Sequence, residues 1–310
     1  MRICLLTPDP GHPLLAAAAA LLATGHRVDA LDPTAGDAPP AELFGPGPLA
    51  DVYLLKARTP RALALARYLE ERGAPVVNSA AATEFCQDRT AMAELAHRSG
   101  LPFAATRTAA TLADLPDPDG PIVVKSRHSR RHDLVARVDD AAALRALAAE
   151  WPDEPVIAQP FMANSGWDQK LWVVDGQVFH ARRRSELADP VDPVAAVDPV
   201  ETVDPVGPSG ASRPVADGER GFWPADLPAD RARLALRVGE VFALDVYGVD
   251  LLDGPDEPVI VDVNAFPGIR GQAGAPEALA GLALRTARRG TPAAPRLPGQ
   301  RQARPRATDR

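Results

Sequence analysis

The most specific signal in this sequence is the segment Val261-Asp262-Val263-Asn264-Ala265-Phe266-Pro267-Gly268. Asp262 and Asn264 stand two residues apart in a run with strand character, so their side chains point to the same face. A carboxylate and an amide oxygen at a strand end suit a hard cation such as Mg²⁺, although an ordinary polar turn explains the pair equally well. Residues 247–252 form another predicted strand, and a hairpin between the two strands would bring Asp250 beside this pair.

Two of the three lysines stand where a phosphate-binding cation is expected. Lys125 ends the apolar run 121–125 and precedes a polar loop, and Lys170 begins another predicted strand. An ammonium group at the end of a buried strand is a compact charge beside flexible backbone, which suits a phosphate. A solvated lysine is the ordinary alternative. Lysine is rare in this chain, however, because only three of its 34 Lys and Arg residues are lysines.

The pattern of predicted elements changes near residue 86. Residues 1–85 alternate short apolar runs with helical stretches, which predicts an α/β domain with a parallel sheet and helices on its faces. From residue 86 onward, strands follow one another with shorter connections, and Asp175-Gly176 is a strong hairpin signal. We therefore predict that an α+β region with an antiparallel sheet follows the α/β domain.

Two further segments break this pattern. The tripeptide Asp-Pro-Val recurs from Asp189 to Val206, and this density of proline predicts a mobile loop over residues 185–221. Such a loop is either a substrate lid or a tolerated insertion. Residues 285–310 are rich in Arg, Pro and Gly, which predicts a disordered basic tail. A solvated appendage is the simpler interpretation of the tail, and contact with an acidic partner is the alternative.

Composition narrows the class of protein. The net charge of −7 gives no nucleic-acid footprint, so we expect no nucleic-acid partner. Two cysteines provide neither a disulfide framework nor a metal-binding spacing, which favours a reduced, cytoplasmic protein. The apolar run 14–23 is too short to cross a bilayer and follows a turn, so we expect a first helix there and no membrane partner. The motifs also lack a Ser-His-Asp or Cys-His pattern for covalent catalysis.

The order of the motifs resembles the ATP-grasp superfamily over roughly residues 50–285. This resemblance implies that the α+β region is an ATP-grasp fold of two subdomains, at residues 86–160 and 161–284. It also implies ATP with Mg²⁺ as cofactors, Mn²⁺ being the alternative ion. The matching segments are the strand ending in Lys125, Gln159-Pro160-Phe161-Met162, Asp168-Gln169-Lys170, Arg182-Arg183, Gly248-Val249-Asp250 and Asp262-Val263-Asn264.

Two groups within the superfamily look similar. RimK-like carboxylate–amine ligases share Asp168-Gln169-Lys170 and the helix that contains Asp88-Arg89. The inositol 1,3,4-trisphosphate 5/6-kinase group is similar in residues 129–134 and 264–268. We favour the ligase, in which ATP converts a carboxylate to an acyl phosphate that an amine then attacks. A hydroxyl kinase is the runner-up, and a catalytically silent ATP-binding regulator is the remote alternative.

The resemblance also implies roles for individual residues. Catalytic roles fall to Lys170, Arg183 and His132, which hold substrate phosphates in a kinase, whereas in a ligase Arg183 holds a carboxylate. The substrate is then a small carboxylate or a phosphorylated molecule, and a homodimer is expected by analogy alone. The implied ATP contacts are Lys125 and Lys170 at the phosphates, Gln159, Pro160, Phe161 and Met162 at the adenine, and Asp168. The implied metal ligands are Asp250, Asp262 and Asn264.

The sequence departs from the superfamily in two places. The loop 126–132 contains no glycine, so side-chain cations would have to replace the usual backbone cradle for phosphate. Pro160 stands where many relatives carry Glu, and a proline offers no N–H group to adenine.

Overall fold

The computed structural model describes residues 1–36, 38–44, 47–130, 132–162, 166–185, 187, 223–224, 226–254 and 257–290. Most of the predicted mobile loop 185–221 and of the predicted basic tail 285–310 therefore lies outside the described residues. No helix in the described part of the chain is long and apolar enough to cross a membrane.

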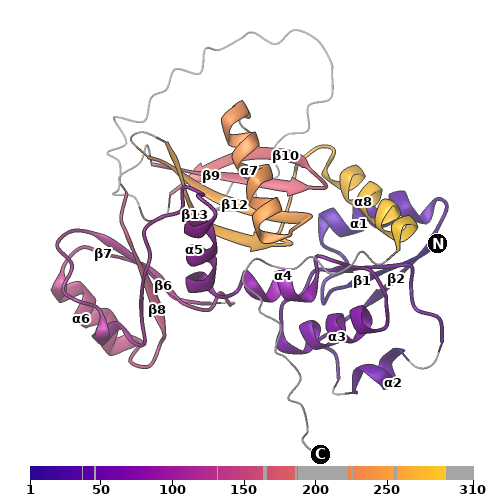
Figure 1. Ribbon diagram of the computed structural model, residues 1–310, viewed down its shortest axis with the longest axis horizontal. Helices are drawn as coiled ribbons and strands as arrows, with labels where there is room; N and C mark the ends of the chain where they lie inside the picture. Colours follow the sequence, from indigo (N-terminus) through magenta and orange to yellow (C-terminus); the bar gives the residue numbers. More distant parts are fainter. Residues whose placement is uncertain are drawn as a thin grey trace, which may run out of the picture.

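The N-terminal region forms the predicted parallel sheet, with helices on both faces (Figure 1). Alternate residues of its strands enter two different cores. Ile3 and Leu5 pack with helices α1 (Pro13–Ala23) and α8 (Ala275–Arg289), whereas Leu6 and Leu55 pack with α3 (Pro60–Glu71). The strands, in the order β2-β1-β3-β4, are β1 (Arg2–Leu6), β2 (Arg27–Leu31), β3 (Val52–Leu55) and β4 (Val76–Val77). The helices of this region are α1 (Pro13–Ala23), α2 (Pro40–Phe44), α3 (Pro60–Glu71) and α4 (Ala80–Phe85), and the last helix of the chain, α8 (Ala275–Arg289), joins them.

A second, antiparallel sheet follows helix α5 (Arg89–Arg98). One of its faces is covered by α6 (Ala141–Glu150), and the core between them includes Val124, Leu144 and Val156. The strands, in the order β5-β8-β6-β7, are β5 (Arg107–Ala109), β6 (Ile122–Ser126), β7 (Val135–Val138) and β8 (Val156–Pro160), and a 3₁₀ turn spans Leu112–Asp114.

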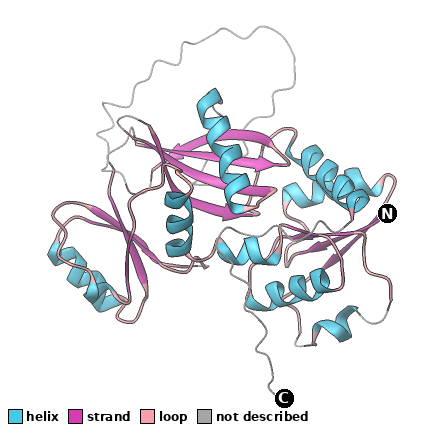
Figure 2. Ribbon diagram, viewed as in Figure 1, coloured by secondary structure: helices cyan, strands magenta, loops and turns pink. Residues whose placement is uncertain are grey.

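The third sheet is antiparallel and lies between two helical layers (Figure 2). Leu171 and Val173 point toward α5 and α7 (Ala229–Phe242), whereas Trp172 and Val174 point toward α1 and α8. The predicted hairpin turn at Asp175-Gly176 forms, with φ angles of 53° and 76°. The strands, in the order β11-β10-β9-β12-β13, are β9 (Trp167–Val174), β10 (Gln177–Arg184), β11 (Trp223–Pro224), β12 (Val246–Asp253) and β13 (Pro258–Ala265).

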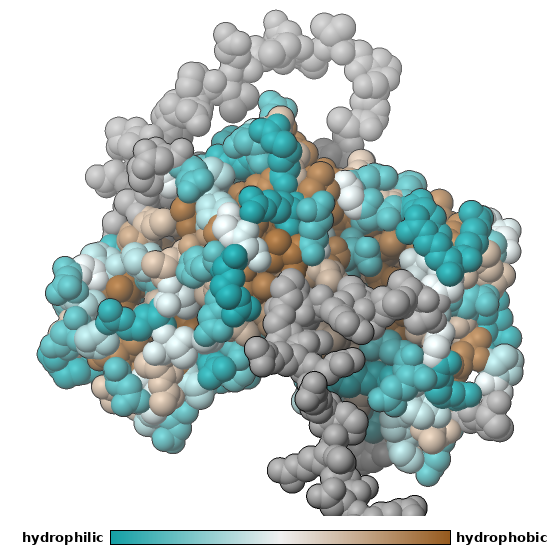
Figure 3. All heavy atoms as spheres, viewed as in Figure 1, coloured by the Kyte–Doolittle hydropathy of each residue, from teal (hydrophilic) through white to brown (hydrophobic). Residues whose placement is uncertain are grey.

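One asparagine fixes the N-terminal sheet to the third sheet. Asn78, which is 1% exposed, follows β4 and bonds with the start of β12. Its Oδ1 accepts hydrogen bonds from the N–H groups of Asp245 and Val246 at 2.9 and 3.0 Å, and its Nδ2 donates to the carbonyl of Val246 at 2.7 Å. Together with the apolar core that α8 shares with α1, these hydrogen bonds fix the position of the N-terminal sheet relative to the third sheet. The face seen in Figure 3 is mostly hydrophilic, with a hydrophobic area beside α7. Leu236 on α7 and Leu227, which precedes this helix, are exposed.

Candidate functional site

Four of the residues predicted to bind ATP or metal lie on one face of the third sheet. In the strand register, Asp250 of β12 stands opposite Lys170 of β9 on one side and opposite Asp262 of β13 on the other. Lys170 forms an ion pair with Asp250, and Asn264 Nδ2 donates to Asp250 Oδ2 at 3.1 Å. The hairpin expected from the sequence thus forms, and together with the pairing of β9 to β12 it brings these four side chains together.

A β-bulge in β13 shapes this face. Asp250 pairs with Asp262, but the next residue, Leu251, pairs with Ile260, so Val261 is an extra residue. The carbonyl of Val261 accepts a hydrogen bond of 2.9 Å from Lys125 Nζ, which reaches across from the end of β6. The bulge therefore attaches the second sheet to the third through one of the two lysines assigned to phosphate.

Arg89 is the central cation that residue-by-residue reasoning from the sequence did not assign. It lies in the first turn of α5, which Asp88 caps, and its side chain is 7% exposed. Its guanidinium donates to Asp133 Oδ2 at 2.7 Å, to the Ser126 carbonyl at 2.8 Å and to Asp262 Oδ2 at 3.3 Å. The available signal was Asp88-Arg89 itself, an N-cap followed by a cation at the first helical position.

The charges of this cluster stabilise one another. Burial alone would raise the pKa of Asp262, but Arg89, Lys125 and Lys170 hold it below its usual value. Burial lowers the pKa of Lys125, and the nearby Asp262 opposes that shift. Asp262 is thus a carboxylate at neutral pH, with cations on several sides.

The glycine-free loop after Lys125 is anchored by side chains. Arg127 forms a bidentate ion pair with Asp88, the shortest contact being 2.7 Å. The N–H group of Ser129 donates to the Gln87 carbonyl at 2.8 Å. His132 is exposed in this loop with φ 59°, and it makes no hydrogen bond or ion pair with a described residue. The structure therefore does not bring His132 into the cluster.

The predicted adenine linker is partly occupied by contacts within the protein. The Gln159 side chain, on β8, is buried and donates to Thr106 Oγ1 at 3.1 Å. Phe161 donates its N–H to the Pro121 carbonyl at 2.9 Å, and its ring stacks under Arg137. Since Pro160 has no N–H, Met162 is the first linker residue whose N–H is not bonded to another described residue.

Arg183 and Asp168 form a pair at the far end of the same face. They stand opposite each other in the β9–β10 register, and Arg183 Nε lies 3.4 Å from Asp168 Oδ2. Lys170 is opposite Ala181 in the same ladder, so Arg183 lies two residue pairs from Lys170.

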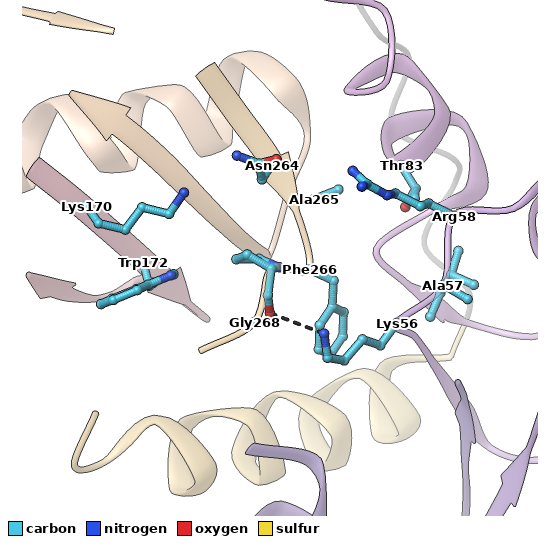
Figure 4. Close-up of a pocket in the computed structure, with 12 residues that line it drawn as sticks. Lys56, Ala57, Arg58, Thr83, Lys170, Trp172, Asn264, Ala265, Phe266 and Gly268 are labelled. Atoms are coloured by element: carbon cyan, nitrogen blue, oxygen red, sulfur yellow. Dashed lines mark hydrogen bonds between the residues drawn. The ribbon is translucent and has the colours of Figure 1, made fainter. Parts of the chain in front are cut away.

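A cavity of about 440 Å³ opens between the third sheet and the N-terminal region. Figure 4 shows Lys170 and Asn264 on one side and Lys56 and Arg58 on the other. The sequence motifs assign no role to Lys56 or Arg58, although Lys56 is the third of the three lysines. The complete lining is Leu55, Lys56, Ala57, Arg58, Thr83, Lys170, Trp172, Asn264, Ala265, Phe266, Pro267 and Gly268.

Comparison with known protein families and curated proteins gives a consistent result. Residues 220–275 match the family described as RimK-like ATP-grasp domain. A probable alpha-L-glutamate ligase of Thioalkalivibrio sulfidiphilus is 25% identical over 216 residues, which cover 67% of this chain and 65% of that protein. The chain thus matches a little under two thirds of the length of this relative.

Solved structures share the fold over nearly the whole chain. A RimK domain ATP-grasp protein from Sphaerobacter thermophilus has a TM-score of 0.64 and 22% identity, covering 92% of this chain and all of that one. The ATP-grasp ligase PsnB, in complex with a minimal precursor, Mg and ADP, has a TM-score of 0.61 and 16% identity, covering 92% and 97%. The chain therefore has the fold of these ATP-grasp structures, and residues 220–275 match the family described as RimK-like ATP-grasp domain.

Proposed function

We propose that this protein is a Mg-ATP-dependent ligase that joins the carboxylate of a small acid to an amine. The observation that carries the proposal is the charged cluster beside the cavity, in which Lys125, Lys170 and Arg89 surround Asp250 and Asp262. Transfer of a phosphoryl group needs positioned cations and a metal site more than a covalent nucleophile. The similarity to a protein named as a glutamate ligase supports the same reaction class.

The cations have free capacity for phosphate. An ammonium group has three donor hydrogens, and the contact of Lys125 with the Val261 carbonyl uses one of them. Lys170 is paired with Asp250 and lines the cavity, so it can turn between that carboxylate and a phosphate oxygen. Met162 would supply the N–H for adenine. We propose that these three residues bind ATP.

The donor set of the cluster fits Mg²⁺. The two carboxylates are neighbours in the ladder, and Asn264 uses its amide nitrogen on Asp250, which leaves its oxygen for a ligand. An all-oxygen set of this kind is what Mg²⁺ or Mn²⁺ prefers. A metal held there would neutralise phosphate charge and orient the transferred group.

The remaining roles follow from position. Arg183 lies on the same face as Lys170 and could hold the carboxylate of the acid, with Asp168 fixing its orientation. Attack of the carboxylate oxygen on the γ-phosphorus would release ADP and give an acyl phosphate. An amine would then attack the acyl carbon, releasing phosphate and forming the amide.

The test is ADP release by the purified protein with Mg-ATP and a pool of small amino acids, measured with and without an added amine. We expect turnover that rises with the amine, and hydroxylamine should trap the activated acid as a hydroxamate. Asp262→Asn should abolish turnover without unfolding the protein. The matched control is Asp117→Asn, because Asp117 is an exposed carboxylate whose ion-pair partner, Arg145, is also exposed.

Two results would contradict the proposal. Turnover by Asp262→Asn with an unchanged Mg²⁺ requirement would remove the metal assignment. ADP formed only with inositol phosphates, and without any hydroxamate, would identify a hydroxyl kinase instead.

A further inference from the structure

The wall of the cavity opposite the charged cluster is also cationic. Lys56 and Arg58 follow β3 and line the cavity from the N-terminal region, whereas the lining contains neither Asp nor Glu (Figure 4). In a ligase, the cluster around Lys170 would hold ATP and the reacting carboxylate. Lys56 and Arg58 are then available to recognise another part of the substrate.

Lys56 has no acidic partner in the described part of the chain. Its ammonium lies 3.5 Å from the Pro267 carbonyl and 5.9 Å from the centre of the Phe266 ring. Burial is the main cause that lowers its pKa, and the neighbouring cations Arg270 and Arg58 lower it further, whereas Asp9 opposes them. The charged form of a half-buried lysine with more cationic than acidic neighbours is destabilised, and a bound anion would stabilise it.

Arg58 is positioned by the loop that follows Lys125. Its NH1 donates to Ser129 Oγ at 3.0 Å, a neutral contact that leaves the charge of the guanidinium uncompensated. A guanidinium has five donor hydrogens, so several stay available for an oxygen anion.

The surroundings of His12 point the same way. This histidine is 5% exposed, and neither of its ring nitrogens has a hydrogen-bond partner. A Cβ added to Gly268, which lines the cavity, would lie 3.5 Å from His12 Nε2, so the imidazole ring faces the part of the lining that Gly268 forms. The first turns of α1 and α3 begin at the same edge of the parallel sheet, and their dipoles favour negative charge there.

We infer that Lys56 and Arg58 bind a second anionic group of the substrate, so that the acid carries one negative group at the reacting carboxylate and another at this wall. The inference rests on the proposed ligase function and narrows it to acids with two anionic groups. A second carboxylate and a phosphate ester share the chemistry that this wall recognises. A cavity of about 440 Å³ accommodates a molecule of the size of an acidic amino acid.

The test is calorimetric titration in the presence of Mg²⁺ and a non-hydrolysable ATP analogue. The probes are L-glutamate, L-glutamine, which has the same shape without the second charge, and O-phospho-L-serine. We expect L-glutamate or O-phospho-L-serine to bind about tenfold more tightly than L-glutamine, as one charge-assisted hydrogen bond predicts. The two acids distinguish a carboxylate from a phosphate as the second group.

Variants assign the effect to the wall. Lys56→Met should weaken binding of the preferred acid by about tenfold or more and leave L-glutamine unchanged. The exposed Arg58 is replaced as Arg58→Gln, which carries little risk to folding and should act in the same direction. Arg27→Gln is the matched control, because Arg27 is an exposed cation at the opposite edge of the same sheet.

Equal binding of L-glutamate, O-phospho-L-serine and L-glutamine would overturn the inference, as would unchanged binding in both Lys56→Met and Arg58→Gln. Failure of both acids to bind at millimolar concentration would also overturn it. Because titration needs no turnover, Lys56-dependent binding without ADP release would refute the ligase and leave the anion site. Turnover with an acid that has a single anionic group would support the ligase and refute the second anion site.

Discussion

Replacement of Arg89 by methionine tests whether the central guanidinium stabilises the cluster. Removing one partner of a buried ion pair costs about 3–5 kcal/mol, because the other charge is left uncompensated. Asp133 and Asp262 would both lose their partner, yet their side chains keep 15% and 13% exposure, and Lys125 and Lys170 still compensate Asp262. We therefore expect the lower end, a loss of about 3 kcal/mol in the free energy of unfolding.

Urea unfolding followed by circular dichroism measures this loss, and a domain with about 5–15 kcal/mol of stability would stay folded. Arg89→Lys keeps one charge but cannot reach all three acceptors, so it should lose about half as much. Arg127→Met is the control, since its pair with Asp88 is more exposed and should contribute under about 1 kcal/mol. A loss below about 1 kcal/mol in Arg89→Met would refute the reasoning, because desolvation would then cancel the two ion pairs.

Three further predictions concern the rest of the fold. Asn78→Ala should lower the free energy of unfolding by about 2–5 kcal/mol in the same urea assay, since the N–H groups of Asp245 and Val246, just before and at the start of β12, lose their acceptor. The pKa of His12 is lowered to about 4 by burial, so the unfolded chain takes up this proton first as the pH falls below about 6.5. Neutral His12 therefore makes its full contribution to the free energy of unfolding above about pH 6.5. This contribution, up to about 3 kcal/mol, is lost as the pH falls to about 4. The pH profile of His12→Gln should lack this slope, and an identical profile would contradict the assignment. Gly239→Ala should cost about 1–3 kcal/mol in thermal melts, because the added methyl overlaps the Tyr247 hydroxyl.

Strand and helix periodicity predicted most of the architecture. The parallel N-terminal sheet, the hairpin at Asp175-Gly176 and the hairpin that pairs Asp250 with Asp262 all form as expected. These features depend on local patterns: alternation of apolar residues, a two-residue turn and a two-residue spacing on one strand. The proposed domain boundaries remain predictions. The last of them, at residue 284, falls within helix α8, which shares an apolar core with α1.

The parts that sequence reasoning missed depend on contacts between distant segments. The bulge at Val261 appears only when β12 is paired with β13, and Arg89 becomes central only because α5 packs against Asp262, far along the chain. Short helices such as α4 lack a long enough apolar period to be recognised. Lys56 stood out only as a rare lysine, because its role depends on a cavity between two sheets.

In the proposed ligase, the charge balance of the cluster would let it stay folded and still accept ATP. Arg89, Lys125 and Lys170 face Asp133, Asp250 and Asp262, so the described cluster buries about as much positive as negative charge. ATP would bring phosphates for the cations and Mg²⁺ would bring a cation for the carboxylates, so each group would exchange one partner for another without a large desolvation cost. The wall of Lys56 and Arg58 has no such internal balance. Its excess positive charge therefore favours an anion supplied by the substrate, and ionic strength should weaken binding there more than at the balanced cluster.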